Sequence, residues 1–144
     1  MSGYSGTPLV RKLGLRPAAR MFVRAPPENY AQLLEPLPAG VQRVRRIDGR
    51  TDLIHLFVTR TTALRRALTV ARRAMRADAV IWVSWPKKTA GVDSDVSENG
   101  VRALALPLGL VDVKVCAVDE TWSGLKLVLR VSERAGAANP PRRA

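Results

Sequence analysis

The sequence contains very little of the residue types that build disulfide frameworks and metal centres. Its 144 residues include one cysteine and one histidine, which excludes an internal disulfide and any metal site that needs several such ligands. Aromatic residues make up only 5% of the chain. No stretch approaches the roughly 18 uncharged apolar residues that span a bilayer, and the first residues lack the pattern of a signal peptide. We therefore expect a cytoplasmic protein with no membrane partner.

The chain contains enough apolar residues for one core and an excess of positive charge. Hydrophobic residues make up 47% and charged residues 25%, a composition typical of globular domains. The 24 basic residues outnumber 12 acidic ones, and because lysine occurs at five positions, 19 of the 24 are arginine. The excess is uneven: residues 1–77 carry 15 basic and 4 acidic side chains, whereas residues 78–133 carry 6 and 8.

Short apolar runs alternate with helical patterns along the chain. The runs at 52–59 and 79–85 are almost continuous, which is typical of strands covered on both faces. Strands that alternate with helices indicate parallel crossovers. We predict helices over residues 8–13, 28–34, 61–76 and 95–106, and strands over residues 20–24, 41–47, 52–59, 79–85, 111–118 and 125–131.

These elements predict an α/β fold, a single three-layer Rossmann-like domain whose mostly parallel sheet ends in an antiparallel β-hairpin. The domain is expected over residues 7–133, after a flexible segment at 1–6 and before a disordered basic tail at 134–144. Thr7 is expected to cap the first helix. Asp95 and Glu98 have the spacing of a capping box, which predicts a helix start there.

The helix expected over 61–76 separates apolar residues, Val70 among them, from arginines, and no acidic residue lies between Asp52 and Asp78. A surface of one sign indicates nucleic-acid or acidic-partner binding. No aromatic residue is interleaved to stack on single strands, and the general preference for arginine over lysine makes an incidental charge the alternative. The predicted nucleic-acid-binding residues are Arg43, Arg45, Arg46, Arg65, Arg66, Arg72, Arg73 and Arg76.

A second candidate site lies where strands end. If the strand at 111–118 is parallel to the one at 79–85, the segments that follow them meet at one edge of the sheet. The pattern predicts a pocket for a small anion, in which the lysines bind charge and the tryptophan forms an apolar wall. The alternative is a surface ion pair that holds the hairpin to the sheet. The predicted ligand-binding residues are Lys87, Lys88, Thr89, Asp119, Glu120, Trp122 and Ser123.

Support for catalysis and for a metal is thin. Cys116 and His55 are the only nucleophile–base pair, and both lie within strands, so a buried thiol and a satisfied interior histidine are the simpler interpretation. Asp93, Asp95 and Glu98 suggest a metal, but the helix cap already accounts for two of them. We assign no catalytic residue and no metal ligand.

Four segments carry a resemblance to a known family: SGYSGTPL (2–9), WPKK (85–88), GLVDVKVCAVDETWSGLK (109–126) and the segment around Glu98. The chain resembles a small bacterial family described as a domain of unknown function. More broadly, it is similar to the second half of class I methyltransferases. That resemblance implies a Rossmann-like fold lacking one helix–strand unit, and S-adenosylmethionine as the possible cofactor.

The sequence departs from those methyltransferases at the cofactor turn. Arg24–Glu28 contains no glycine and two prolines, which lack amide donors. Asp48 is nearly placed to hold a ribose hydroxyl, and is equally suited to a turn. The leading hypothesis is a non-catalytic, methyltransferase-like binding or regulatory domain for a small anionic ligand or a protein partner. The alternatives are a nucleic-acid-binding module, an enzyme that acts on an anionic metabolite, and a residual S-adenosylmethionine-dependent methyltransferase.

Overall fold

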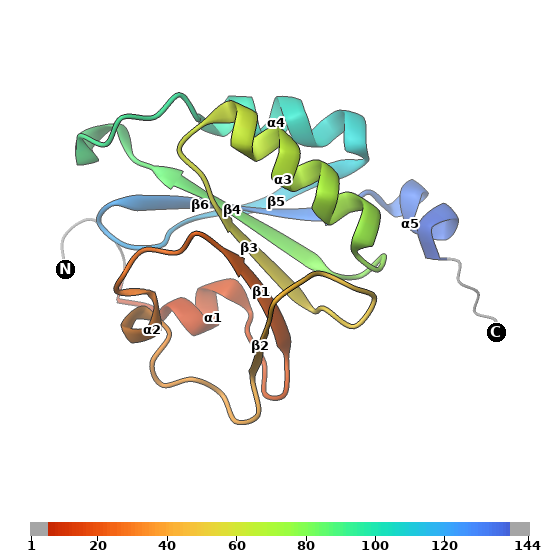
Figure 1. Cartoon of the computed structure of the whole chain (residues 1–144), viewed down its shortest axis with the longest axis horizontal. Helices are drawn as coiled ribbons and strands as arrows, with labels where there is room; N and C mark the ends of the chain where they lie inside the picture. Colours follow the sequence, from red (N-terminus) through yellow and green to blue (C-terminus); the bar gives the residue numbers. More distant parts are fainter. Residues whose placement is uncertain (1–5, 139–144) are drawn as a thin grey trace.

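The computed structural model describes residues 6–138, with the backbone alone for residues 135–138. Its centre is one six-stranded sheet in the order β2-β1-β3-β4-β6-β5 (Figure 1). The strands are β1 (Arg20–Arg24), β2 (Gln42–Val44), β3 (Leu53–Phe57), β4 (Val80–Pro86), β5 (Leu110–Ala117) and β6 (Trp122–Leu129). The helices are α1 (Leu9–Leu13), α2 (Tyr30–Leu33), α3 (Thr61–Ala74), α4 (Glu98–Ala105) and α5 (Val131–Ala138), with 3-10 turns η1 (Lys88–Ala90) and η2 (Leu106–Leu108).

The pairing of the strands confirms the predicted fold class. β1 is parallel to β2 and to β3, and β3 is parallel to β4. β6 is antiparallel to both of its neighbours, β4 and β5. β3 and β4 are the strands with continuous apolar runs, and every residue of β3 is buried. A mostly parallel sheet thus ends in an antiparallel hairpin.

Helices cover both faces of the sheet, which gives three layers (Figure 1). α1 and α2 cover one face, where the core includes Leu13, Phe57 and Trp82. α3 and α4 cover the other, where the core includes Leu68 and Ile81. Ile81 and Trp82 are successive residues of β4, so their side chains point to opposite faces.

The starts of two helices differ from the prediction. α1 begins after Pro8, which makes no side-chain cap, so Thr7 is not the capping residue. α4 begins after Ser97, whose hydroxyl accepts a hydrogen bond from Gly100 N–H. The carboxylate of Asp95 instead accepts from Thr61 N–H over 2.7 Å, at the start of α3. The predicted capping box is therefore wrong, because Asp95 caps a helix that precedes it in the chain.

The described chain ends in a helix that continues beyond residue 133, the predicted end of the domain. α5 extends over Val131–Ala138, so residues 134–138 of the predicted tail are helical. Two contacts that the sequence did not predict hold the first turn of α5. Arg134 Nε donates to Leu129 O over 2.9 Å, and Glu133 lies 3.7 Å from Arg72. Residues 139–144, and residues 1–5 of the predicted flexible segment, lie outside the described residues.

No helix within residues 6–138 is long and apolar enough to cross a membrane.

Candidate functional site

The turn after β1 is the place where a Rossmann-like fold holds a nucleotide cofactor. Here the guanidinium of Arg24 donates to the carbonyl of Phe57, at the end of β3, over 2.7 Å. Ala25 follows with a φ of 52°, and Pro26 and Pro27 come next. An arginine side chain therefore reaches across the edge of the sheet where a glycine-rich turn would present backbone amides.

This edge does not fit S-adenosylmethionine. The turn contains no glycine, and Pro26 and Pro27 lack the amide donors that such a turn would present to the cofactor. The helix that follows, α2, has only four residues. Asp48 belongs to a turn: its carboxylate accepts from Arg50 N–H over 2.8 Å, and this hydrogen bond holds the pKa of Asp48 below its usual value. Of the two roles considered for Asp48, the structure places it in the turn.

A cavity of about 510 Å³ lies where β4 ends, and three of the predicted ligand-binding residues line it. β5 and β4 are both antiparallel to β6, so they run in the same direction and end at the same edge. Lys87 and Lys88 follow β4, and Ser123 of β6 is paired with Trp85. Lys87 N–H donates to Thr121 O over 2.8 Å, which fixes this segment to the hairpin. The other lining residues are Trp85, Pro86, Val96, Ser97, Glu98 and Asn99.

The other four predicted residues do not line this cavity. Asp119 shapes the hairpin turn, because its carboxylate accepts from Thr121 N–H and Trp122 N–H over 2.9 and 2.8 Å. Trp122 packs edge-on against Phe57, with ring centroids 5.0 Å apart, in the core beneath α1 and α2. Trp122 and Ser123 are strand residues rather than loop residues, so they face opposite sides of the sheet. Thr89, in η1, and Glu120, in the turn, are exposed.

The cavity wall contains one acidic residue, and its charge is already engaged. Glu98 forms an ion pair with Arg102, one turn later in α4. Arg102 also contacts Asp112 over 3.0 Å. Glu98 is therefore paired within its own helix, and Lys87 and Lys88 are the basic residues among those that line the cavity.

The eight predicted nucleic-acid-binding arginines do not form one surface. Arg72 Nε donates to Leu108 O over 2.7 Å. Arg76 lies 2.6 Å from Asp52 and 2.5 Å from Asp78. Both side chains are engaged in holding the fold. Arg43 is paired with Met21, whose side chain lies in the core beneath α1 and α2, so Arg43 points to that face of the sheet.

The remaining five arginines belong to α3 and to the segment after β2. Arg45, Arg46 and Arg66 line a groove beside α3, whereas Arg65 and Arg73 are exposed along the helix. Val70, predicted to lie on the apolar face, is 56% exposed beside this groove. Within the described part of the chain, no ion pair joins any of these five arginines to a carboxylate.

His55 belongs to a buried polar chain that the sequence did not reveal. Its Nδ1 lies 2.7 Å from the hydroxyl of Tyr30, and its Nε2 lies 2.7 Å from the hydroxyl of Ser84. All three residues are buried, and burial lowers the pKa of His55 to about 3. The imidazole is therefore neutral and satisfied, as predicted for an interior histidine. The three side chains join α2, β3 and β4 inside the core, which is a structural role.

The isolated thiol and the acidic residues provide no further site. Cys116 is half-buried, and burial raises the pKa of its thiol, which disfavours the reactive thiolate. Asp93 pairs with Arg60, while Asp95 caps α3. Among residues 6–138, no three side chains of histidine, cysteine, aspartate or glutamate gather as metal ligands.

Solved structures share the arrangement of layers and strands described above. A methyltransferase dependent on S-adenosylmethionine from Aquifex aeolicus matches 87% of this chain and 89% of its own, with 12% identity and a TM-score of 0.64. The magnesium protoporphyrin IX methyltransferase of Synechocystis, with bound S-adenosylmethionine, matches 84% of this chain and 74% of its own, with 11% identity and a TM-score of 0.55. The fold is class I methyltransferase-like.

The likeness extends to a third solved structure and concerns the fold alone. Fibrillarin from Aeropyrum pernix, with natively bound S-adenosylmethionine, matches 83% of this chain and 73% of its own, with 12% identity and a TM-score of 0.52. No protein-family model and no curated sequence matches the chain. At such low identity the fold is shared without any implication for the reaction or the ligand.

Proposed function

We propose that this methyltransferase-like domain is a non-catalytic binding domain for a small anionic ligand, held in the cavity at the end of β4. The observation that carries the proposal is the convergence of Lys87 and Lys88 on a cavity of about 510 Å³. A volume of that size suits a small ligand. Glu98, the acidic residue of the lining, is paired with Arg102.

Two further features favour an anionic ligand over a methyl donor such as S-adenosylmethionine. Arg24 lies across the edge that the cofactor would use. Three segments that carry the resemblance to the small bacterial family, those around Lys87, Glu98 and Ser123, also meet at the cavity. We propose membership of that family on the same ground, with this cavity as its shared binding site.

Titration with inorganic phosphate and pyrophosphate, followed by NMR, tests the proposal. The amides of Lys87, Lys88 and Ser123 are expected to shift together. The double variant Lys87→Gln/Lys88→Gln is expected to weaken binding by about tenfold or more, since charge-assisted hydrogen bonds contribute about 1.5–3 kcal/mol each. Calorimetry with S-adenosylmethionine is expected to give no binding heat.

The matched control is Lys114→Gln, which removes the same charge from an exposed position on β5 outside the cavity. Its affinity for pyrophosphate is expected to stay within twofold of the unchanged protein. Equal losses of affinity in the control and the double variant would mean that the net charge of the protein, and not this cavity, accounts for the binding. Transfer of a methyl group from S-adenosylmethionine by the pure protein would overturn the non-catalytic part of the proposal.

Nucleic-acid binding is the second candidate, and the observation in its favour is that five arginines of α3 and of the segment after β2 have no carboxylate partner within residues 6–138. The proposed surface consists of Arg45, Arg46, Arg65, Arg66 and Arg73. Arg72 and Arg76 are left out because their side chains hold the fold.

The triple variant Arg65→Ser/Arg66→Ser/Arg73→Ser tests this second candidate. Its affinity for duplex DNA or RNA is expected to fall, and the slope of log affinity against log salt is expected to flatten by about 3 if each side chain neutralises one phosphate. The control is Arg11→Ser/Arg16→Ser/Arg43→Ser, which removes the same charge from exposed positions elsewhere. Affinity is measured by fluorescence anisotropy. Equal losses of affinity in both variants would mean that the α3 surface is not the binding site.

A further inference from the structure

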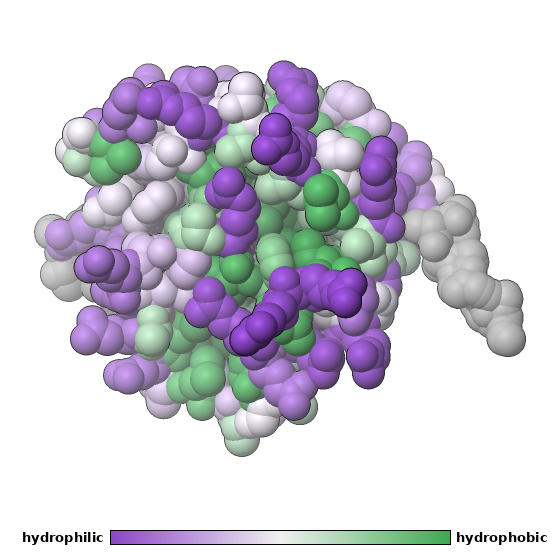
Figure 2. Space-filling model, viewed as in Figure 1, coloured by the Kyte–Doolittle hydropathy of each residue, from purple (hydrophilic) through white to green (hydrophobic). Residues whose placement is uncertain are grey.

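A groove of about 370 Å³ lies between α3 and the strands beside it. α3 and α4 form the upper layer in Figure 1, and neither extends over β1 and β2 at the other side of the sheet. Figure 2 shows the result from the same direction, as apolar surface exposed between hydrophilic side chains. This groove lies on a face of the sheet and is distinct from the cavity beyond the end of β4, because the two share no lining residue.

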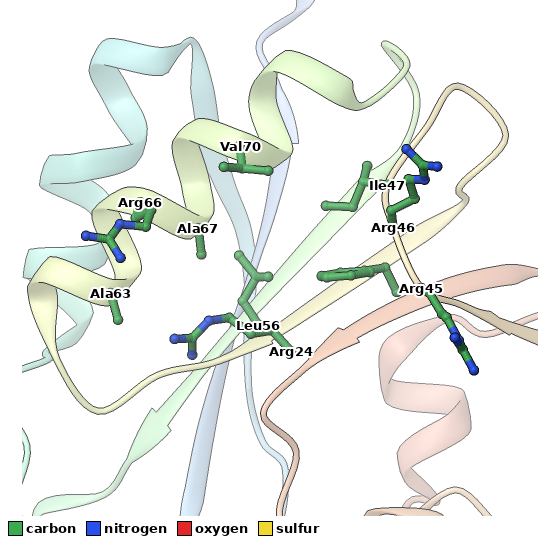
Figure 3. Close-up of a pocket in the computed structure, with 10 residues that line it drawn as sticks. Arg24, Arg45, Arg46, Ile47, Leu56, Ala63, Arg66, Ala67 and Val70 are labelled. Carbon is green, nitrogen blue, oxygen red and sulfur yellow. The ribbon is translucent and has the colours of Figure 1, made fainter.

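The floor and walls of the groove are apolar. Phe22 of β1 and Leu56 of β3 come from the sheet, and Ile47 comes from the segment after β2. Ala63, Ala67 and Val70 come from α3. Alanines four residues apart lie on one side of a helix, so their small side chains leave room between the helix and the sheet. Figure 3 shows Ala63, Ala67, Val70 and Leu56 around this space.

Positive groups stand at the ends of the groove. Figure 3 shows the guanidinium groups of Arg24 and Arg66 at one end, Arg46 beyond Ile47 at the other, and Arg45 directed away. Arg24 is held in place by its hydrogen bond to Phe57 O. Arg66 is exposed, with no carboxylate paired to it within residues 6–138. No acidic residue lines the groove.

We propose that this groove binds a small amphiphilic anion, with its apolar body on Leu56, Ala67 and the neighbouring apolar side chains and its acidic head between Arg24 and Arg66. The apolar lining contributes affinity through burial, and the two guanidinium groups at one end favour a carboxylate, sulfonate or phosphate over a neutral head. The volume is that of a small-molecule site. This inference goes beyond the proposed function, because it concerns a different site and a ligand with a large apolar part.

The fluorescence of anilinonaphthalene sulfonate, an apolar ring system with one sulfonate, tests the proposal on the full chain. We expect saturable binding that decanoate, naphthalene sulfonate or both displace, and that decanol displaces at least tenfold less well. Arg66→Gln is expected to weaken binding of the probe by about tenfold, the loss of one charge-assisted contact. Ala67→Phe is expected to abolish binding, because the larger side chain fills the groove.

The matched control is Arg65→Gln, which removes the same charge from the neighbouring exposed position of α3, and its affinity is expected to stay within twofold. Lys87→Gln/Lys88→Gln is also expected to leave probe binding unchanged, so failure at one site is distinguishable from failure at the other. Displacement by naphthalene sulfonate but not decanoate narrows the ligand to an aromatic anion, and the reverse narrows it to an acyl anion. Equal losses in Arg65→Gln and Arg66→Gln, probe binding that survives Ala67→Phe, or displacement by duplex DNA but by neither organic anion, would overturn the proposal.

Discussion

Acidification from pH 7 to pH 5 is expected to lower the free energy of unfolding by about 2 kcal/mol through His55 alone. Burial lowers the pKa of this imidazole to about 3 in the folded chain, against about 6.5 in the unfolded chain. Between those two values the unfolded state binds a proton that the folded state does not, so stability falls as the pH falls, by about 1.4 kcal/mol per unit. His55 therefore lowers the stability little above the unfolded pKa of about 6.5, and the loss grows as the pH falls below that value.

The contacts of His55 explain why the folded protein keeps the ring neutral. Tyr30 and Ser84 provide two hydroxyl groups, each 2.7 Å from one ring nitrogen. A neutral imidazole donates one hydrogen bond and accepts another, which these partners satisfy. Phe57 stacks on the ring with centroids 4.2 Å apart. No carboxylate is among these contacts, so nothing compensates a buried positive charge.

Because His55 is the only histidine in the chain, its titration is measured without ambiguity. NMR of the ring nitrogens is expected to show no protonation in the folded protein from pH 7 to pH 5. Urea unfolding over the same range is expected to show the slope given above, and the variant His55→Gln is expected to remove most of that slope. An imidazole that titrates near pH 6.5 in the folded state would contradict the prediction even if the variant fails to fold.

The elements that the sequence predicted well are those set by local periodicity. The apolar runs of β3 and β4 and the helical spacing of α3 each predicted an element within a few residues of its observed bounds. These patterns succeed because burial repeats at the period of the backbone itself. The mostly parallel sheet and its antiparallel hairpin followed from the alternation of strands and helices, whereas the order of the strands was not predicted.

The predictions that failed depend on side chains that reach distant segments. Asp95 caps α3 from 34 residues away, and Arg72 contacts Leu108 from 36 residues away. Neither contact leaves a periodic signal in the sequence. Trp122 shows a second cause: the strand begins three residues earlier than predicted, which turned an assumed loop residue into a strand residue, and alternation then placed it on the opposite face from Ser123.

Replacing Arg76 with alanine is expected to lower the free energy of unfolding by about 2–3 kcal/mol, because hydrogen bonds to charged groups contribute about 1.5–3 kcal/mol each and this site is half-exposed. Arg76 donates to Asp52 over 2.6 Å, to Asp78 over 2.5 Å and to Thr51 O over 3.1 Å. Its loss leaves Asp52 without one of its two cationic partners at the amino end of β3.

Asp52 makes the effect larger than that of an isolated surface pair. Partial burial on its own raises the pKa of Asp52, but hydrogen bonds from Arg20 N–H and from Arg76 hold it below the usual value. The same carboxylate therefore joins β1, β3 and the end of α3. Without Arg76 the pKa of Asp52 is expected to rise, which NMR of the carboxyl carbon measures directly.

The control for Arg76→Ala is Arg65→Ala, an arginine of α3 that is exposed and has no carboxylate partner within the described residues. Its cost in urea unfolding is expected to stay within about 0.5 kcal/mol, since alanine and arginine favour helices almost equally. Equal costs for the two variants would mean that the ion pairs of Arg76 add nothing to stability. A difference of the expected size would separate the arginines of this chain into those that hold the fold and those left available to bind an anion, a distinction that net charge alone does not make.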